Sequence, residues 1–345
     1  MIPAPHRLRL DSGALIANWR TLDAMSGGAA CGAAVKADGY GVGAHQVVRH
    51  LAETGCRDFF VATWREALAL ADAEVAVSVL HGVRDEDMAP ALASRSARPV
   101  LNSVQQVRRW RDGGGGACDV MVDTGMNRLG IRPEDVAAGL LDGLRVETLM
   151  SHLASADEDV AFNAVQRDTL AGLRGRCAAR RISLANSAGI GLGPDYAFDL
   201  TRPGIALYGG VVSPAFAGRI AQVVTPQAQI LQRRLVPAGQ GVGYNLTWTA
   251  TADTEVAILN LGYADGYLRC FSGKGLACSA DGIALPVIGR VSMDLTAIDV
   301  AAAPDLAEGD WVSIAYDLPA MSAVSGLSQY ELITGLGPRF DRIWA

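Results

Sequence analysis

The chain has 345 residues, of which 50% are hydrophobic and 19% are charged, so it carries enough apolar material for a buried core and is not intrinsically disordered. Acidic residues outnumber basic ones, and the formal net charge is −6 at pH 7. Because no block of basic residues is present, we expect neither nucleic acid nor an anionic membrane surface as a partner.

The remaining bulk features predict a cytoplasmic protein without a metal site. A transmembrane helix needs roughly 20 apolar residues in succession, and the sequence has no such run. Charges at Arg7 and Asp11, with no apolar run after them, do not fit a secretory signal. The six cysteines form no CxxC pair, so we expect reduced thiols. Neither they nor the five histidines have the spacing of zinc ligands.

Short apolar runs alternate with longer amphipathic runs in the first part of the chain. We expect eight strands, at 31–37, 59–63, 75–80, 97–103, 119–124, 144–154, 182–188 and 198–209. Helical spacing occurs between several of them, as at 45–54 and 64–73. Continuous apolar strands separated by helices indicate a parallel sheet, and eight such units predict a (β/α)8 TIM-type barrel. Within the barrel, a capping-box pattern at 155–158 predicts the start of a long helix that runs towards Arg180.

The pattern changes after about Gln222. The remainder lacks a long amphipathic helix, is rich in Val, Ile, Thr and Gly, and has turn signals such as 237–243 and 279–282. We therefore expect an α/β chain, with the barrel over residues 1–222 and a mainly-β domain over residues 223–345.

Several reactive residues fall where the strands of the predicted barrel end, which is where barrel enzymes place their active sites. These residues are Lys36, Arg128, His152, Asn186, Ser187 and Arg202. One such residue alone is more often a surface or structural group, but their joint placement at one rim indicates a site.

The same rim has the parts of a cofactor site. Tyr40 and Ser187, with backbone N–H groups at the end of the eighth strand, can together hold a phosphate. A lysine that bonds to an aldehyde, a phosphate clamp and an arginine facing a ring nitrogen are what pyridoxal phosphate requires.

Sequence blocks along nearly the whole chain resemble those of the alanine racemase family of pyridoxal phosphate enzymes. The matching blocks are AAVKADGYGVG (33–43), DTGMNRLG (123–130), SHLASADE (151–158), ANSA (185–188), RPGIALYGG (202–210), GVGYNLTW (241–248), LGYADGY (261–267), GRVSMD (289–294) and YELITGLGPR (330–339). The resemblance implies a barrel followed by a β domain, pyridoxal 5'-phosphate as cofactor, and a homodimer. It also implies interconversion of L-alanine and D-alanine, and thus production of D-alanine.

The resemblance assigns two catalytic bases. Lys36 corresponds to the lysine that holds the cofactor covalently and exchanges the α-proton on one face of the substrate. Tyr244 of the other subunit corresponds to the base on the opposite face, which a racemase needs because one base returns the proton mainly to its own face. By the same resemblance, His152 would lie beside this tyrosine and Arg202 beside the histidine. Since an arginine does not give up its proton, Arg202 would leave the pyridine nitrogen unprotonated.

The other site residues follow from the same resemblance. The residues that correspond to cofactor-binding positions are Lys36, Tyr40, Ser187, Arg202, Gly204, Ile205 and Tyr330. The residues that correspond to substrate-binding positions are Arg128, Met293, Asp294 and Tyr263, with Met293 supplied by the partner subunit.

Two positions depart from the family pattern. Many relatives have a carbamylated lysine where this chain has Met121, and a histidine where it has Leu184. Both groups support active-site arginines, so Arg128 and Arg202 lose a neighbour that would orient them. Near Arg128 we expect a small anion such as chloride as the replacement; a carboxylate from elsewhere in the fold is the alternative.

Two other functions stay open at this point. One is a racemase for serine or a broader range of amino acids, because pocket volume does not follow from sequence. The other is a pyridoxal-phosphate-binding barrel without turnover. The presence of a second domain, with Tyr244 and Met293, argues against the latter.

Overall fold

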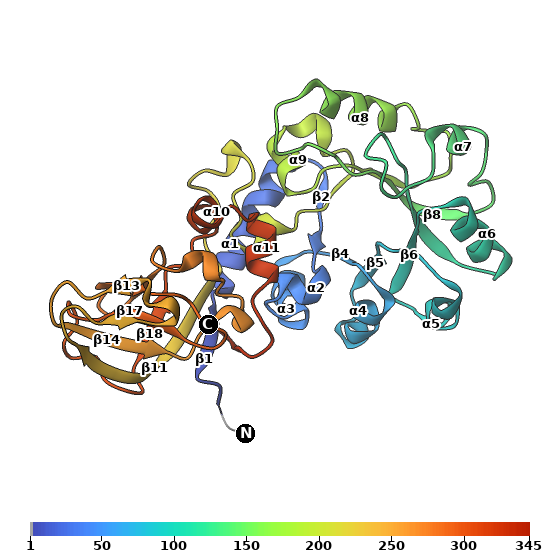
Figure 1. The fold of residues 1–345 in the computed structure, drawn as a ribbon. Coiled ribbons are helices and arrows are strands. Elements are labelled where there is room, and N and C mark those ends of the chain that lie inside the picture. The colour runs from blue at the N-terminus through green and yellow to red at the C-terminus, as the bar shows by residue number, and fades with distance from the viewer. Residues whose placement is uncertain (1–2) are drawn as a thin grey trace. The chain divides into compact units, whose positions relative to one another are not determined.

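The computed structural model describes residues 3–345, which form two compact units (Figure 1). One unit comprises residues 14–221. The other joins residues 222–345 with the described residues up to Gly13. No helix among residues 3–345 has the length and apolar character needed to cross a membrane.

The first unit is a barrel of parallel strands. Its strands are β2 (Ala30–Cys31), β3 (Ala33–Ala34), β4 (Asp58–Val61), β5 (Ala76–Val79), β6 (Ala97–Leu101), β7 (Ala117–Met121), β8 (Arg145–Met150), β9 (Arg181–Ser183) and β10 (Leu200–Thr201). They pair in the order β2-β10-β9-β8-β7-β6-β5-β4-β3. Because β2 and β3 are the two halves of one strand, this order closes the sheet, and the predicted TIM-type barrel is confirmed.

Gly32 separates the two halves of that first strand. Its amide donates to the carbonyl oxygen of Thr201 (2.9 Å). A Cβ at this position would lie 2.7 Å from the carbonyl oxygen of Asp58. Only glycine fits at position 32, because any side chain would collide with the neighbouring strand.

Helices cover the outside of the barrel, as Figure 1 shows for α3 to α8. The helices of this unit are α1 (Ser12–Met25), α2 (Lys36–Tyr40), α3 (Ala44–Thr54), α4 (Trp64–Ala69), α5 (Met88–Ala93), α6 (Val104–Asp112), α7 (Pro133–Ala137), α8 (Ala161–Ala171) and α9 (Ser187–Gly191). Their apolar stripes are buried: α3 buries Val47, Val48 and Leu51, and α6 buries Val107 and Trp110.

The helix predicted from the capping-box pattern at 155–158 begins later than expected. Residues 155–160 form a turn, and α8 starts at Ala161 and ends at Ala171. The buried Asn163 side chain donates to the carbonyl oxygens of Ser155 (3.0 Å) and Glu158 (2.8 Å). These bonds satisfy the turn's carbonyl groups without a helix, so the predicted start was wrong.

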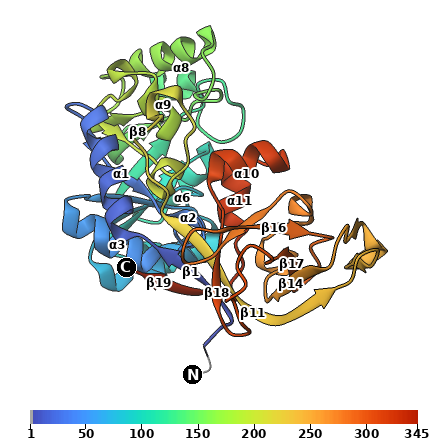
Figure 2. The ribbon, with the colours of Figure 1, turned by 90° about the vertical axis from the view of Figure 1, so that its left-hand side faces the viewer.

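The second unit is a β domain with the strand order β14-β17-β16-β15-β18-β11-β1-β19, in which β14 also pairs with β11 (Figure 2). Its strands are β1 (His6–Leu10), β11 (Val224–Val236), β12 (Gly241–Val242), β13 (Trp248–Thr249), β14 (Thr254–Leu259), β15 (Leu276–Cys278), β16 (Ala284–Ile288), β17 (Thr296–Asp299), β18 (Trp311–Ile314) and β19 (Asp341–Trp344). Two helices, α10 (Leu318–Ser325) and α11 (Gln329–Thr334), belong to the same unit. One core cluster of this domain contains Val236, Ala250, Val256, Ile288 and Ala297.

The start of the chain belongs to this β domain, whereas we expected residues 1–222 to form the barrel. Strand β1 pairs antiparallel with β11 and parallel with β19. His6, Leu8 and Leu10 are buried, and the residues between them are more exposed. This alternation fits a strand of the β domain, whose pairing partners lie far away in the sequence. Residues 1 and 2 lie outside the described residues.

Candidate active site

Lys36 lies at the rim of the barrel, at the start of a left-handed turn. The strand β3 ends at Ala34, and residues 37–41 all have positive φ, between 53° and 89°. Such a conformation costs about 1–3 kcal/mol for each residue other than glycine, so it persists only where its surroundings enforce it. Hydrogen bonds within the turn run from Gly39 N to the Val35 carbonyl and from Gly41 N to the Ala37 carbonyl (2.8 Å each).

Tyr40 and Ser187 meet at the end of the eighth barrel strand. The Ser187 hydroxyl accepts hydrogen bonds from the backbone amides of Gly204 (2.9 Å) and Ala206 (3.2 Å). A Cβ at Gly204 would overlap the Tyr40 hydroxyl oxygen. The Tyr40 ring stacks on Tyr208 with 4.7 Å between the ring centroids. Hydroxyl and amide donors therefore gather around a position that only glycine can occupy.

Tyr40, Ser187 and Gly204 are together called the cradle. The residues next to it stabilise the local structure. The Asn186 side chain accepts from Gly189 N (2.9 Å) and caps α9. Ile205 is buried and opens the 3₁₀ turn that continues to Tyr208. The Tyr208 hydroxyl donates to the Ala34 carbonyl (2.9 Å), which ties this turn to the strand leading to Lys36.

Arg202 is buried and held by three acceptors. Its guanidinium donates to the Ser183 hydroxyl and to the carbonyl oxygens of Ser151 (2.6 Å) and Leu184 (3.3 Å). Burial lowers the pKa of Arg202 to about 10, and the charge of Asp119 opposes that shift. The guanidinium therefore stays charged at neutral pH, and it is fixed in place although position 184 offers no histidine.

Asp119 lies in a polar layer inside the barrel, where branched apolar side chains are more usual. Its carboxylate accepts from the Ser78 hydroxyl (2.6 Å) and from Arg98 Nε (2.8 Å). Arg181 makes two hydrogen bonds to Asp58 (2.9 and 2.6 Å) in the same unit. Burial raises the pKa of Asp119, and the charge of Arg98 opposes the shift.

The two groups that could carry protons at the rim are both driven towards their neutral forms. Burial, together with the charges of Arg202, Arg128 and Lys36, lowers the pKa of His152 to about 3. Solvent reaches the Lys36 side chain, yet the surrounding atoms desolvate its amine and lower its pKa. The charge of Arg128 adds to this shift, and Glu66 opposes it. A lowered pKa increases the fraction of unprotonated amine, the form that acts as nucleophile or base.

Arg128 has an exposed side chain, and among residues 3–345 no Asp or Glu forms an ion pair with it. Met121, at the end of β7, is buried and cannot contribute charge. An internal carboxylate as the partner of Arg128 therefore finds no support. The pKa of His152 is lowered by burial and by the positive charges of Arg202, Arg128 and Lys36. Because three positive charges lie near one point of the rim, the rim attracts anions.

In the β domain, loops bring Tyr263, Met293 and Asp294 together. The amide of Tyr263 donates to the Ser292 carbonyl (3.0 Å), and a Cβ at Gly262 would overlap the Met293 carbonyl. Tyr244 follows Gly243, whose Cβ would lie 3.5 Å from the amide nitrogen of residue 290. Tyr244 is 64% exposed and Met293 is 55% exposed. Tyr330 lies in the first turn of α11, on a different element of the same domain.

The residues that hold these loops in place were not identified from the sequence. Arg339 donates to Asp294 (2.8 Å) and to the buried Asp265 (2.7 Å), which also accepts from Gly262 N (3.0 Å). His6 Nε2 lies 3.2 Å from the same Asp265 carboxylate. Asp265 and Arg339 both fall within the matching blocks, but nothing in the local pattern pairs two residues so far apart.

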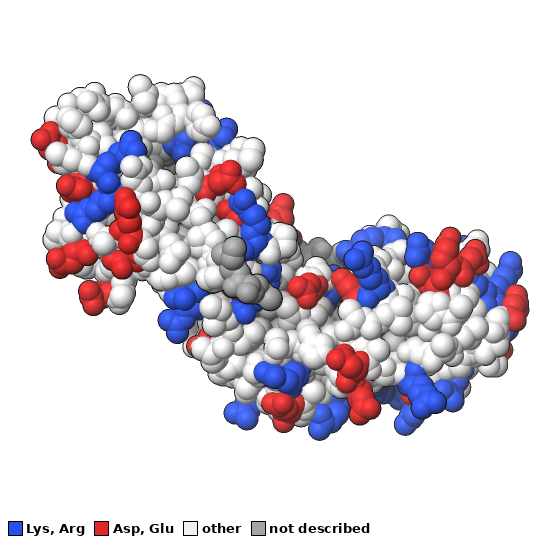
Figure 3. Space-filling model, turned by 90° about the horizontal axis from the view of Figure 1, so that it is seen from below, with Lys and Arg blue, Asp and Glu red and all other residues white. Residues whose placement is uncertain are grey.

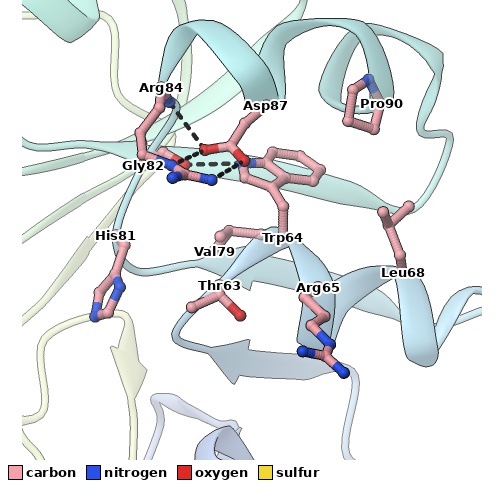
Figure 4. Close-up of a pocket in the computed structure, with 10 residues that line it drawn as sticks. All are labelled: Thr63, Trp64, Arg65, Leu68, Val79, His81, Gly82, Arg84, Asp87 and Pro90. Carbon is pink, nitrogen blue, oxygen red and sulfur yellow. Dashed lines mark hydrogen bonds and ion pairs between the residues drawn. The ribbon is translucent and has the colours of Figure 1, made fainter.

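A separate cavity of about 590 Å³ lies beside the loops that follow β4 and β5 (Figure 4). Its polar contacts are internal: Trp64 Nε1 donates to the Gly82 carbonyl (2.8 Å), and Arg84 makes two hydrogen bonds of 2.9 Å to Asp87. None of the predicted site residues lines it. On the face drawn in Figure 3, acidic and basic side chains are interspersed, without a large field of one sign.

Comparison with known proteins identifies the family to which the chain belongs. The family models for the alanine racemase N-terminal and C-terminal domains match residues 10–212 and 223–344. An alanine racemase of Acidiphilium cryptum is 42% identical over 351 residues, covering 97% of this chain and 98% of the relative. A relative from Agrobacterium fabrum named alanine racemase, catabolic, is 40% identical over 98% of this chain and 92% of its own length. The crystal structure of alanine racemase from Bartonella henselae, with covalently bound pyridoxal phosphate, has a TM-score of 0.89 and 32% identity, covering 99% of this chain and 100% of that chain.

Proposed function

Because the chain belongs to the alanine racemase family, we propose that it is an isomerase that interconverts L-alanine and D-alanine with pyridoxal phosphate as cofactor. The observation that carries this proposal is the convergence at one barrel rim of Lys36, the Tyr40–Ser187–Gly204 cradle and the buried Arg202.

The residues at this rim fit pyridoxal phosphate. The amide and hydroxyl groups around Gly204, where a Cβ would overlap Tyr40, suit a phosphate group. Lys36 supplies an amine of lowered pKa for covalent attachment, and Arg202 a fixed donor for the ring nitrogen. Ile205 and Tyr330 complete the proposed binding set. When bound, the cofactor would act as the electron sink that makes the substrate α-proton removable.

We assign the two proton-transfer roles to Lys36 and Tyr244. Lys36 holds and returns the proton on one face of the substrate. Tyr244, from the second subunit of a homodimer, does so on the other. The high exposure of Tyr244 in its own domain supports a role in which another copy of the chain covers it. His152 serves as the hydrogen-bonding neighbour of that tyrosine, and burial together with the fixed charge of Arg202 keeps it neutral.

Substrate binding falls to Arg128 and to the loop cluster of the partner's β domain. The charge of Arg128 attracts the substrate carboxylate. The backbone amide of Met293 would bind the same carboxylate, and Asp294 and Tyr263 would line the entry to the site. The bonds of Arg339 to Asp294 and Asp265 support this placement because they hold the loops in one arrangement.

A substrate panel tests the proposed function. We expect L-alanine to be racemised with kcat/KM at least about tenfold above that for L-serine or L-lysine, because a site fitted to a methyl group discriminates against each added group by about 1–3 kcal/mol. Loss of circular dichroism on incubation with each amino acid measures this. Comparable rates for serine or lysine would identify a broader racemase, and no racemisation of any substrate would reject the function.

We further propose that a chloride ion lies beside Arg128, in place of the negative charge that a carbamylated lysine at 121 would supply. Two observations support this: within the described residues 3–345 no Asp or Glu forms an ion pair with the Arg128 guanidinium, and the buried Met121 carries no charge. Replacing chloride by a large, weakly bound anion should raise KM for L-alanine about tenfold with little change in kcat, equivalent to ~1.4 kcal/mol of binding.

The control is bicarbonate, which should have no specific effect on this protein but should affect the variant Met121→Lys. Crystals grown in bromide test the position directly through anomalous scattering. If no peak lies beside Arg128, the anion proposal is wrong.

A further inference from the structure

The carboxylate of Glu66 binds three backbone amides from two separate segments of the barrel. Its Oε2 accepts from Ala62 N (2.6 Å) and Thr63 N (3.2 Å), and Thr63 Oγ1 in turn accepts from Glu66 N (3.3 Å). This is a capping box at the start of α4. Its Oε1 accepts from Ala37 N (2.9 Å), 29 residues earlier in the chain. A capping box needs only the bonds between Glu66 and the start of α4, and not the bond to Ala37.

The bond to Ala37 acts on the peptide group that joins it to Lys36. Ala37 is the first residue of the left-handed turn 37–41, whose non-glycine members are strained. The next residue of the turn, Asp38, is tied to α3 by a bond from Ala44 N to its Oδ1 (2.8 Å). Glu66 ties the near end to α4. The direction in which the Lys36 side chain leaves the backbone depends on this near end.

We propose that Glu66 is a positioning residue for Lys36: its carboxylate holds the strained turn against α4 and so fixes where the amine points. The inference rests on the proposed role of Lys36. Two charged groups interact with the amine: Arg128, from the loop after β7, and Glu66 itself, from α4. The charge of the amine in turn affects His152, which follows β8.

The test compares two full-length variants that both damage the cap of α4. Glu66→Gln keeps the size of the side chain but replaces one acceptor oxygen by a donor, so it cannot satisfy both Ala37 and the cap. Thr63→Ala removes the other half of the capping box and leaves the bond to Ala37 intact. We expect both to lose similar thermal stability.

The two variants should differ at the turn. In Glu66→Gln we expect hydrogen exchange at Ala37 to become about tenfold faster or more, and kcat to fall about tenfold with KM nearly unchanged. In Thr63→Ala, exchange over 36–43 and kcat should stay near those of the parent protein. If Thr63→Ala loses as much kcat as Glu66→Gln, or if exchange at Ala37 is the same in both, Glu66 is only a helix cap and the proposal is overturned.

A third variant separates placement from charge. Glu66→Asp keeps the negative charge but is one methylene shorter, so it should share the fast exchange and the loss of kcat. Full activity in Glu66→Asp despite fast exchange would show that charge alone matters and would overturn the proposal. If the parent protein racemises no amino acid, the proposed function fails, while the exchange comparison still tests the tie between Glu66 and the turn.

Discussion

Replacing Lys36 by alanine is expected to lower kcat for alanine racemisation about 10⁴-fold or more, because one change removes both the covalent anchor and a proton-transfer group. The structural reasons are the strained turn that places Lys36 at the barrel rim and the lowered pKa of its amine. Strained backbone of this kind clusters at active sites, which fits a catalytic role for Lys36.

The chain offers a simple control, since Lys36 and Lys274 are its only lysines. Borohydride reduction of the cofactor-loaded protein, followed by peptide mapping, should place the adduct on Lys36. Lys274→Arg should retain the adduct and the activity, because Lys274 lies in the β domain. An adduct on Lys274 would reject the assignment of the cofactor site.

Removing the hydroxyl of Tyr244 is expected to separate the two directions of the reaction. Tyr244→Phe should slow α-proton removal from L-alanine by about 10²–10⁴-fold and affect removal from D-alanine far less, because Lys36 serves the opposite face. Deuterium incorporation from solvent into each enantiomer measures the two steps separately. Tyr196→Phe, which removes a hydroxyl from the 3₁₀ turn at 194–196 of the barrel unit, is the matched control.

Complementation tests whether Tyr244 acts across a dimer. Tyr244 and Leu246 are 64% and 62% exposed, and both lie on a loop of the β domain. If each site takes Lys36 from one subunit and Tyr244 from the other, a dimer of Lys36→Ala with Tyr244→Phe contains one intact site. A one-to-one mixture of the two inactive variants should then recover roughly a quarter of the parent activity. Mixed dimers purified by two tags that remain inactive would show that the tyrosine serves its own subunit.

The barrel could be predicted from the sequence because its signals are local. Each buried strand, such as that ending before Lys36, is a short apolar run followed by a helix with its own periodicity. The carboxyl ends of parallel strands necessarily meet, so the order of strands along the chain is enough to assign Lys36, Ser187 and Arg202 to one rim. The change in pattern near Gln222 likewise separated the β domain.

Only the tertiary structure decided which distant groups pair. Strand β1 joins the β domain through partners at 224–228 and 341–344, and no local pattern identifies partners at that distance. The supports of Arg202 are a serine hydroxyl and carbonyl oxygens of other strands, which sequence does not distinguish from any other backbone groups. The second oxygen of Glu66 binds Ala37 only because two neighbouring βα units bring α4 beside the turn. Periodicity and composition are properties of neighbouring residues, whereas hydrogen bonds across the fold depend on where every strand finally lies.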